Sequence, residues 1–206
     1  MTKNTTFNLK EVDINSTCIT ISNHYFIINF DHLLQFEKLD SLIIHDIHLT
    51  QKELNIIFQK KTLTMLSLCN CNIFNIKGIS QLENLIVLML GYNNISIIKD
   101  IEKLNFLQYL RLDNNNIQFF KFNSTSLSSL NISNNNIKRI KIKAENLIAL
   151  EIDDKLTDLE FILYLNNLIS LLIGNKLYED NKLSILLDQI NLKYRSLKLE
   201  ELISSF

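Results

Sequence analysis

The sequence predicts an α/β solenoid, in which short parallel strands stack into one curved, concave sheet and short helices or extended segments return along the convex side. Three stretches in the middle of the chain fit one template, L-x-x-L-x-L-x-x-N-x-I, and they start at Leu85, Leu107 and Leu127. A related unit starts at Leu63, so the starts at Leu63, Leu85 and Leu107 are 22 residues apart. A template that recurs at a near-constant period is typical of chains in which each unit adds one strand to a coil.

The polar position of the template is expected to form a buried ladder. The aliphatic positions point inward and stack on the same positions of the next turn. Asparagine can pair there with backbone groups that the tight turn leaves buried, because its amide both donates and accepts hydrogen bonds. In the two less regular units near the C-terminus, we expect the ladder position at Asp154 and Asn175. In the regular units it is occupied by Cys71, Asn93, Asn115 and Asn135.

These units resemble leucine-rich repeats (LRRs), and their spacing is most similar to the intracellular class with repeats of about 22 residues, which includes phosphatase regulators. The resemblance is carried by the three template matches and by aliphatic residues that continue every three positions through the regular units. It extends over about 160 residues and implies about eight or nine repeats. It also implies a role in binding other proteins.

The repeats are expected to fill a single domain that covers residues 1–206. Residues 1–38 would form an N-terminal cap with a weak first repeat, and residues 39–178 would hold the repeats. Residues 179–206 would close the other end with an amphipathic helix and a last strand from Tyr194 to Leu202. A cap is expected at each end because a terminal turn has no neighbour to cover its apolar edge.

The segments that return between strands are predicted to differ along the chain. QKELNIIFQKK, in the N-terminal third, has the period of a short helix. The units that start at Leu107 and Leu127 are only 20 residues long, and their returns, QFFKFNSTS and KRIKIKAEN, alternate or lack a helical period. We therefore expect extended segments on the convex side of these two units.

Composition and charge point to an intracellular protein. The net charge is −1 and the pI about 6.4, so neither a nucleic acid nor a membrane is expected as a partner. The first residues, MTKNTTFNLKEVDIN, contain no apolar signal core, and no apolar run approaches the roughly 20 residues of a membrane span. Only three cysteines are present. We expect a monomeric, reduced protein in the cytoplasm, or alternatively in the nucleus.

The concave face is the expected binding surface. Alternate side chains of a strand point out of the sheet, so the variable positions around the last two leucines of each template face the concave side. Tyrosine, methionine and arginine, which are enriched at interfaces, gather there around Tyr109 and Arg111. The alternative is an idle, solvated sheet on which Arg111 pairs with Asp113 or Glu151. The expected partner-binding residues are Met65, Val87, Met89, Tyr92, Tyr109, Arg111, Asp113, Asn131 and Glu151.

A change of charge follows this region. A basic run precedes an acidic one, and the two could steer a charged partner or compensate each other on a solvated surface. Strong RNA binding is not expected, because aromatic residues of the stacking kind do not alternate with the basic ones. The basic run is Lys138, Arg139, Lys141 and Lys143, and the acidic run is Glu151, Asp153, Asp154, Asp158 and Glu160.

No constellation predicts catalysis or a cofactor. Cys69 and Cys71 are separated by one residue, unlike the pairs of a zinc site, and Cys71 fits the buried ladder. His45 and Asp46 have no serine or cysteine placed beside them by a motif. With three glycines in the chain, a phosphate-binding loop is hard to build. We expect no metal, no cofactor and no enzymatic activity.

The favoured function is therefore a protein–protein interaction module, a scaffold or regulatory adaptor, which binds a protein partner on its concave face. Two other functions stay open. One is a substrate-recognition subunit of a larger assembly such as a ubiquitin ligase, which would need a docking segment. The other is a surface adhesion protein, which would need a secretion signal and, in the usual case, disulfides.

Overall fold

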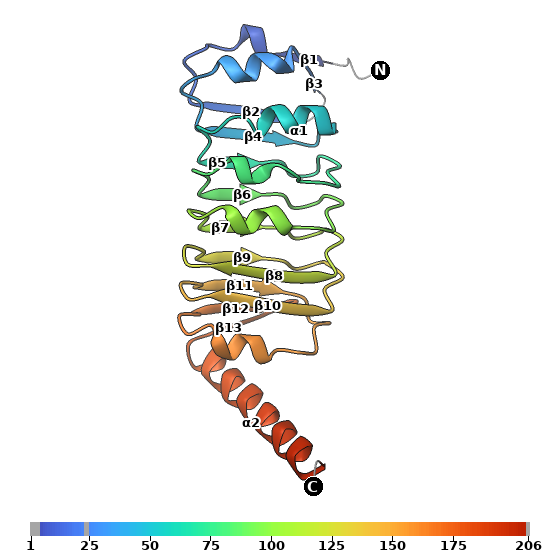
Figure 1. Ribbon diagram of the computed structural model, residues 1–206, viewed down its shortest axis with the longest axis vertical. Coiled ribbons are helices and arrows are strands. Elements are labelled where there is room, and N and C mark those ends of the chain that lie inside the picture. Colours follow the sequence, from blue (N-terminus) through green and yellow to red (C-terminus); the bar gives the residue numbers. More distant parts are fainter. Residues whose placement is uncertain (1–4, 23–24, 205–206) are drawn as a thin grey trace.

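The computed structural model describes residues 5–22 and 25–204, which form an elongated stack of turns with the two ends of the chain at opposite ends of the stack (Figure 1). Within this part, one nine-stranded sheet runs the length of the stack in the order β13-β12-β11-β9-β7-β6-β5-β4-β2. Neighbouring strands pair in parallel, except that β13 is antiparallel to β12. The strands are β2 (Cys18–Ser22), β4 (Ser41–His45), β5 (Met65–Ser67), β6 (Val87–Met89), β7 (Tyr109–Arg111), β9 (Ser129–Asn131), β11 (Ala149–Ile152), β12 (Ser170–Ile173) and β13 (Lys176–Glu179). The α/β solenoid with a parallel sheet is confirmed.

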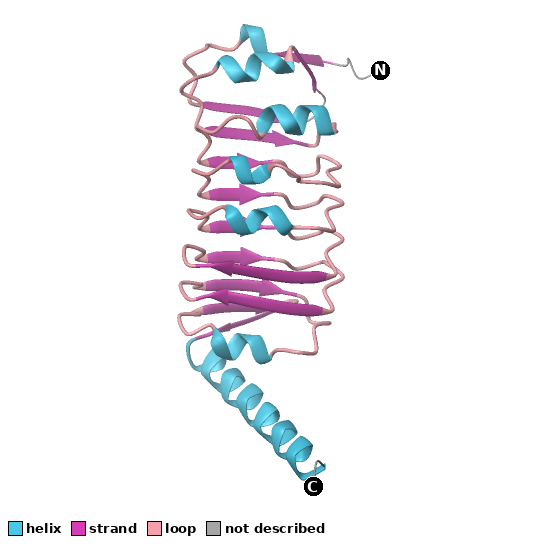
Figure 2. Ribbon diagram, viewed as in Figure 1, coloured by secondary structure: helices cyan, strands magenta, loops and turns pink. Residues whose placement is uncertain are grey.

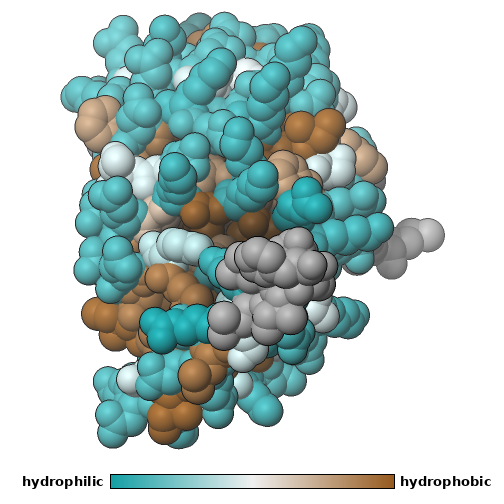
Figure 3. Space-filling model, turned by 60° about the horizontal axis from the view of Figure 1, so that its bottom comes forward, coloured by the Kyte–Doolittle hydropathy of each residue, from teal (hydrophilic) through white to brown (hydrophobic). Residues whose placement is uncertain are grey.

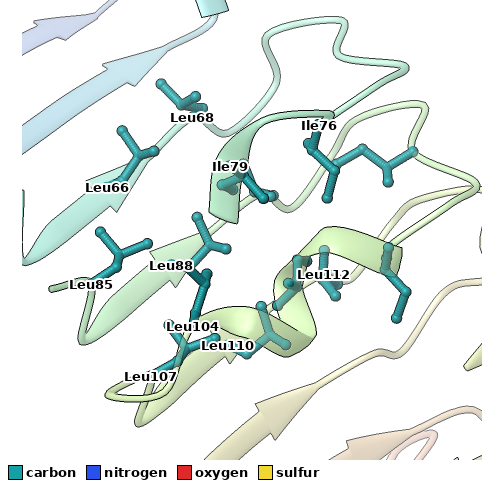
Figure 4. Packing of buried hydrophobic residues seen from close by; sticks show 14 of the residues in the cluster. Leu66, Leu68, Ile76, Ile79, Leu85, Leu88, Leu104, Leu107, Leu110 and Leu112 are labelled. Carbon is teal, nitrogen blue, oxygen red and sulfur yellow. The ribbon is translucent and has the colours of Figure 1, made fainter. Parts of the chain in front are cut away.

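The register of the sheet stacks leucine on leucine. Leu88 of β6 pairs with Leu66 of β5 on one side and with Leu110 of β7 on the other, and all three side chains are buried. Figure 4 shows these residues with the returning aliphatic side chains, such as Ile76 and Ile79, pointing into the space between the layers. Burying one such side chain contributes about 1.5–3 kcal/mol. Each turn therefore supplies the apolar surface that the next turn covers.

The returns form a second layer on the other side of the core (Figure 2). In most turns they are short helices: η2 (Phe30–Gln35), α1 (Gln51–Ile57), η3 (Ile79–Gln81), η4 (Lys99–Lys103) and η5 (Glu160–Tyr164). The helix expected in QKELNIIFQKK is α1, and a capping box between Thr50 and Glu53 starts it. In the two 20-residue units the returns are instead β8 (Phe119–Ser124) and β10 (Arg139–Ala144), which pair in parallel. The helix α1 and the extended returns β8 and β10 both agree with the periodicity of the sequence.

The N-terminal end carries a small separate sheet. β1 (Thr5–Asn8) pairs in parallel with β3 (Tyr25–Ile28), and the short helix η1 (Leu9–Glu11) follows β1. Leu9 and the η2 residues Phe30 and Leu33 are buried against the first turns. We retain residues 1–38 as the proposed N-terminal cap, because these side chains cover the apolar edge of the first turn.

The C-terminal end differs from the expectation. The strand predicted from Tyr194 to Leu202 is wrong: α2 (Asp180–Ser204) is one continuous helix that extends away from the stack (Figure 1). Alternating residues in SLKLEEL suggested a strand. However, the segment holds good helix formers and no glycine or proline to end the helix. Leu183 and Ile190 are buried, and Tyr194 donates a hydrogen bond from Oη to Asp158 Oδ1 at 2.7 Å. The face of α2 that carries Leu183, Ile190 and Tyr194 therefore packs on the last turns as the proposed C-terminal cap.

Hydrophobic side chains remain exposed around α2. Ile185 and Leu192 are 58% and 64% exposed, and Leu177 of β13 is 51% exposed. Figure 3 turns this end toward the viewer and shows hydrophobic surface there between hydrophilic regions. None of the helices in the described part is both long enough and apolar enough to span a lipid bilayer.

Candidate functional site on the concave face

The concave face is the side of the nine-stranded sheet that points away from the returns, and its centre brings the expected patch together. In β7, Leu110 points into the core, so its neighbours Tyr109 and Arg111 point outward. Tyr109 is flanked in register by Val87 and Ser129, and Arg111 by Met89 and Asn131. The alternation that buries one leucine per strand therefore also sets which side chains the face presents.

A shallow cavity of about 520 Å³ opens at this place. Seven of the nine residues that the sequence predicts for partner binding line it, and Met65 and Val87 lie outside the lining. The other lining residues come from the same strands and from the turns that follow them. The seven are Met89, Tyr92, Tyr109, Arg111, Asp113, Asn131 and Glu151.

Arg111 forms the ion pair that the alternative interpretation anticipated. Its Nε donates to Asp113 Oδ1 at 2.5 Å and its Nη2 to Asp113 Oδ2 at 3.0 Å. Hydrogen bonding to Asp113 raises the pKa of Arg111 further above its already high value. Gly91 makes room for the pair, since a Cβ at that position would lie 2.6 Å from Asp113 Oδ1. The Asp113 side chain is 4% exposed, whereas that of Arg111 is 44% exposed and stays accessible to a partner.

Tyr92 has an unusual backbone conformation. Its φ of 58° lies in the left-handed region, where a side chain with a Cβ is disfavoured by roughly 1–2 kcal/mol. Asparagine and aspartate tolerate this region best among residues with side chains, and glycine is unrestricted. The equivalent positions of four other turns hold asparagine or aspartate: Asp46, Asn70, Asn114 and Asn134.

The equivalence of these turns is shown by their hydrogen bonds. The amide of Asn70 donates to the carbonyl of Gly91 in the next turn, Tyr92 to Asp113, and Asn114 to Ser133, at 3.0–3.1 Å. Tyr92 thus adopts the same turn as its neighbours with a less suitable residue. Its ring is 54% exposed and lies 6.0 Å from the Arg111 guanidinium carbon. The core therefore does not require a tyrosine at this position.

A second polar cluster lies beside Arg111. Asn131 donates from Nδ2 to Glu151 Oε2 at 2.6 Å, and Ser133 Oγ lies 3.1 Å from Glu151 Oε1. The Ser133 amide and hydroxyl both lie within hydrogen-bond distance of Asn131 Oδ1. Glu151 forms no ion pair with any residue that the structure describes. Neutral donors thus hold its carboxylate in place on the face.

The ladder lies directly below this surface. Asn93 Nδ2 donates to the carbonyls of Leu68, Leu90 and Gly91 at 2.7–3.2 Å, and its Oδ1 accepts from the amides of Cys71 and Ile73 at 3.0 Å. In the next two turns Asn115 and Asn135 repeat the three bonds to carbonyls, and their Oδ1 atoms accept from the amides of Ile95 and Ile117. The ladder thus fixes the turns that carry Tyr92 and Asp113.

Cys71 takes the ladder position one turn earlier. Its thiol lies 3.2 Å from the carbonyl oxygen of Ile44 and is fully buried. Burial raises the pKa of this thiol to about 12, so it remains protonated. A thiolate is the form that binds metals or attacks substrates, so Cys71 acts here as a structural donor.

The ladder positions expected at Asp154 and Asn175 are wrong, because both side chains are exposed. Asp153 is the residue that joins the turns instead, since its carboxylate accepts from the amides of Asn134 at 2.7 Å and Asn135 at 3.0 Å. The irregular spacing of this unit hid that role, because the template predicted the neighbouring Asp154 for the ladder position. Asp154 packs against Gly174.

The histidine beside Asp46 contacts a buried serine. His45 Nε2 lies 2.7 Å from Ser67 Oγ, but Ser67 is 1% exposed and out of reach of a substrate. Across residues 5–22 and 25–204, no group of three or more histidine, cysteine or acidic side chains is arranged to hold a metal ion. Cys18, Cys69 and Cys71 are all free thiols.

Comparison with known proteins supports the repeat fold. A family model described as leucine rich repeat matches residues 61–117. No curated protein sequence matches the chain significantly. Among solved structures, internalin C2 from Listeria monocytogenes is similar at 21% identity and a TM-score of 0.52, over 75% of this chain and 71% of that chain.

Two further solved structures have the same fold. The functional domain of InlJ from Listeria monocytogenes, which includes a cysteine ladder, is similar at 17% identity and a TM-score of 0.50, over 83% of this chain and 46% of that one. The leucine-rich repeat domain of APL1B is similar at 18% identity and a TM-score of 0.51, over 80% of this chain and 56% of that one. The match spans only about half of each of these two structures.

The comparison corrects one expectation. Internalins are surface or secreted proteins, so the cytoplasmic location expected from the sequence is contradicted. That expectation depended on the first residues and on the small number of cysteines. Neither feature is part of the repeat, and the same solenoid serves proteins outside the cell.

Proposed function

Since the chain is a leucine-rich-repeat protein, and such domains are generally protein–protein interaction modules, we propose that it binds a protein partner at the cavity on its concave face. The proposed contact centre is Tyr92, Tyr109 and Arg111. In this role the chain is a non-enzymatic scaffold or adaptor.

Tyr92 is the observation that carries the proposal. A tyrosine in the left-handed region destabilises the turn by about 1 kcal/mol compared with asparagine. The ring is too exposed to recover this energy by packing in the core. A residue that is locally unfavourable and exposed indicates a functional role, because strained residues gather at binding sites.

The chemistry of the patch fits a protein interface. Tyrosine and arginine are the residue types that most often dominate binding energy. Arg111 is already neutralised by Asp113, so a partner can cover it without leaving an unpaired charge, which is the main cost of burying ions. Gly91, Asp113 and the Asn131–Glu151 cluster hold the surroundings in place before a partner arrives, which reduces the entropy lost on binding.

Affinity capture with quantitative mass spectrometry would test the proposal. Wild-type protein and a Tyr109→Ala variant, which leaves the Arg111–Asp113 ion pair intact, would be used on cell extract and culture medium, and a captured partner would then be titrated by calorimetry. We expect the variant to bind about 2 kcal/mol more weakly with an unchanged melting transition. Thr20→Ala, on the same face at the far end of the sheet, is the matched control. Equal affinity of all three proteins would refute the site.

A surface adhesion protein is the second candidate function. The similarity to surface or secreted internalins favours it over a ubiquitin-ligase subunit. The two candidates share the binding face and differ in where the partner is found. Comparing the partners captured from intact cells with those captured from extract would distinguish the two candidate functions.

A further inference from the structure

The convex side carries a basic surface formed by β8 and β10. Phe120, Phe122 and Ile142 point into the core from these strands. The alternate residues therefore point to solvent, and register places Lys121 beside Lys141 and Lys143 beside Asn123. We call the exposed cations of this strand pair the basic strip. It comprises Lys121, Arg139, Lys141 and Lys143.

The acidic run does not compensate the basic strip. Glu151 and Asp153 lie on the other side of the solenoid, where they bind Asn131 and the turn amides. Glu160 pairs with Lys198 of α2 at 3.3 Å, and Asp158 accepts the hydroxyl of Tyr194. In the part of the chain that the structure describes, the ion pairs involve none of the four cations of the strip. Its positive charge is therefore available to a partner.

The arrangement is unfavourable for a surface that only meets solvent. Like charges directly opposite each other on neighbouring strands destabilise a sheet, and Lys121 and Lys141 are such a pair. All three outward positions of β10 hold cations, although any polar residue would keep the strand soluble. The row follows the strand at steps of about 6.6 Å, with Lys121 about 4.8 Å to the side. This spacing suits the binding of several anionic groups in a row along the strand.

The surroundings of the strip favour a sugar chain. At the Lys143 end a cavity of about 380 Å³ is lined by Asn105, Asn123, Ser124 and Thr125, whose amides and hydroxyls can bind sugar hydroxyls. Glu102 and Glu145 also line it, so it suits a neutral part of a ligand. Phe119 is the one aromatic residue among the outward positions of the two strands, whereas single-stranded nucleic acids need a series of stacking rings.

We propose that the basic strip binds a linear sulfated polysaccharide, with sulfates along Arg139, Lys141, Lys143 and Lys121 and sugar hydroxyls in the adjoining cavity. This site is separate from the concave face and does not depend on the function proposed for it. Short clusters of lysine and arginine are a known basis for heparin binding.

Titration of the full chain with a size-defined heparin oligosaccharide tests the proposal. A Lys121→Gln/Lys141→Gln variant is compared with Lys52→Gln/Lys61→Gln, which removes the same charge from exposed positions in the N-terminal half. We expect the first variant to bind at least tenfold more weakly, with a slope of log affinity against log salt that is shallower by roughly one to two. The second should bind like wild type.

Four results would overturn the proposal. One is the absence of heparin binding at physiological salt. Another is an equal loss in both variants, which would show diffuse charge attraction. The third is equally tight, strip-dependent binding of a single-stranded oligonucleotide or of vesicles with anionic lipid, which would assign the strip to another class of partner. Retained binding to desulfated heparin would also contradict the role given to sulfate.

Discussion

Asn93 and Tyr92 are neighbours in the chain, and they illustrate the two sides of the solenoid. Asn93 is buried and its bonds recur in the next turns, so it obeys the repeat. Tyr92 is exposed and replaces the asparagine or aspartate of other turns, so it breaks the repeat. Inner positions are alike because each turn must fit the next. Where an exposed position departs from the repeat at an energetic cost, stacking does not explain the departure. A function can explain it.

Removing a ladder amide should produce the largest loss of stability. Asn115→Ala would leave the amide of Ile95 without its partner and would remove one of the two asparagine donors of each of the carbonyls of Leu90 and Leu112. An unsatisfied buried group costs about 1–3 kcal/mol and each further lost hydrogen bond about 0.5–1.5 kcal/mol, so we expect unfolding to become easier by about 3 kcal/mol in urea titrations. The exposed neighbour Asn116→Ala should change stability by less than about 0.5 kcal/mol. Similar losses in both variants would refute the ladder as a source of stability.

The second-largest loss of stability is expected from filling the space around Gly91. In Gly91→Ala the new methyl group would displace Asp113, and we expect a loss of about 2 kcal/mol by thermal unfolding. Combined with Asp113→Ala, the same change should cost much less, because the clash is gone. An unchanged cost in that background, measured as a double-mutant cycle, would show that the ion pair is not what Gly91 accommodates.

Cys71 takes the place of an asparagine in the ladder and should make the stability of the fold depend on pH. The folded state holds this thiol protonated up to a pKa of about 12, whereas the unfolded thiol ionises near 9.0. Above pH 9 the unfolded state therefore binds fewer protons, and stability falls as pH rises. We expect a loss of about 1.4 kcal/mol between pH 8 and pH 10 that is absent in Cys71→Ala. Parallel curves for the two proteins would contradict the burial of this thiol.

The sequence predicted the inner side well, because stacking demands the same residue type at the same position in every turn. Leu88, Leu110 and Leu130 could be placed by counting alone, and period 2 then assigned Tyr109 and Arg111 to the concave face. Counting failed where a unit is irregular, as at Asp154, and where two periods competed, as in α2. It also could not show that Glu151 and Asp153 lie on the opposite side from the basic strip, since that depends on the length of each return.

The strain at Tyr92 left a trace in the sequence. Asp46, Asn70, Asn114 and Asn134 form a column of residues suited to left-handed turns, and a tyrosine stands among them. Alignment of the units on their strands reveals the exception. Its meaning requires the backbone angle and the exposure of the ring, which come from the fold.

Tyr92→Asn tests the central claim most directly, because stability and binding should move in opposite directions. Asparagine fits the left-handed turn, so we expect a gain of about 1 kcal/mol in unfolding free energy, or roughly 2–4 °C in Tm. Binding of the captured partner should weaken at the same time, by about 1–2 kcal/mol in calorimetry. A variant that is more stable and binds as tightly as wild type would contradict the account, since Tyr92 would then be strained without a function.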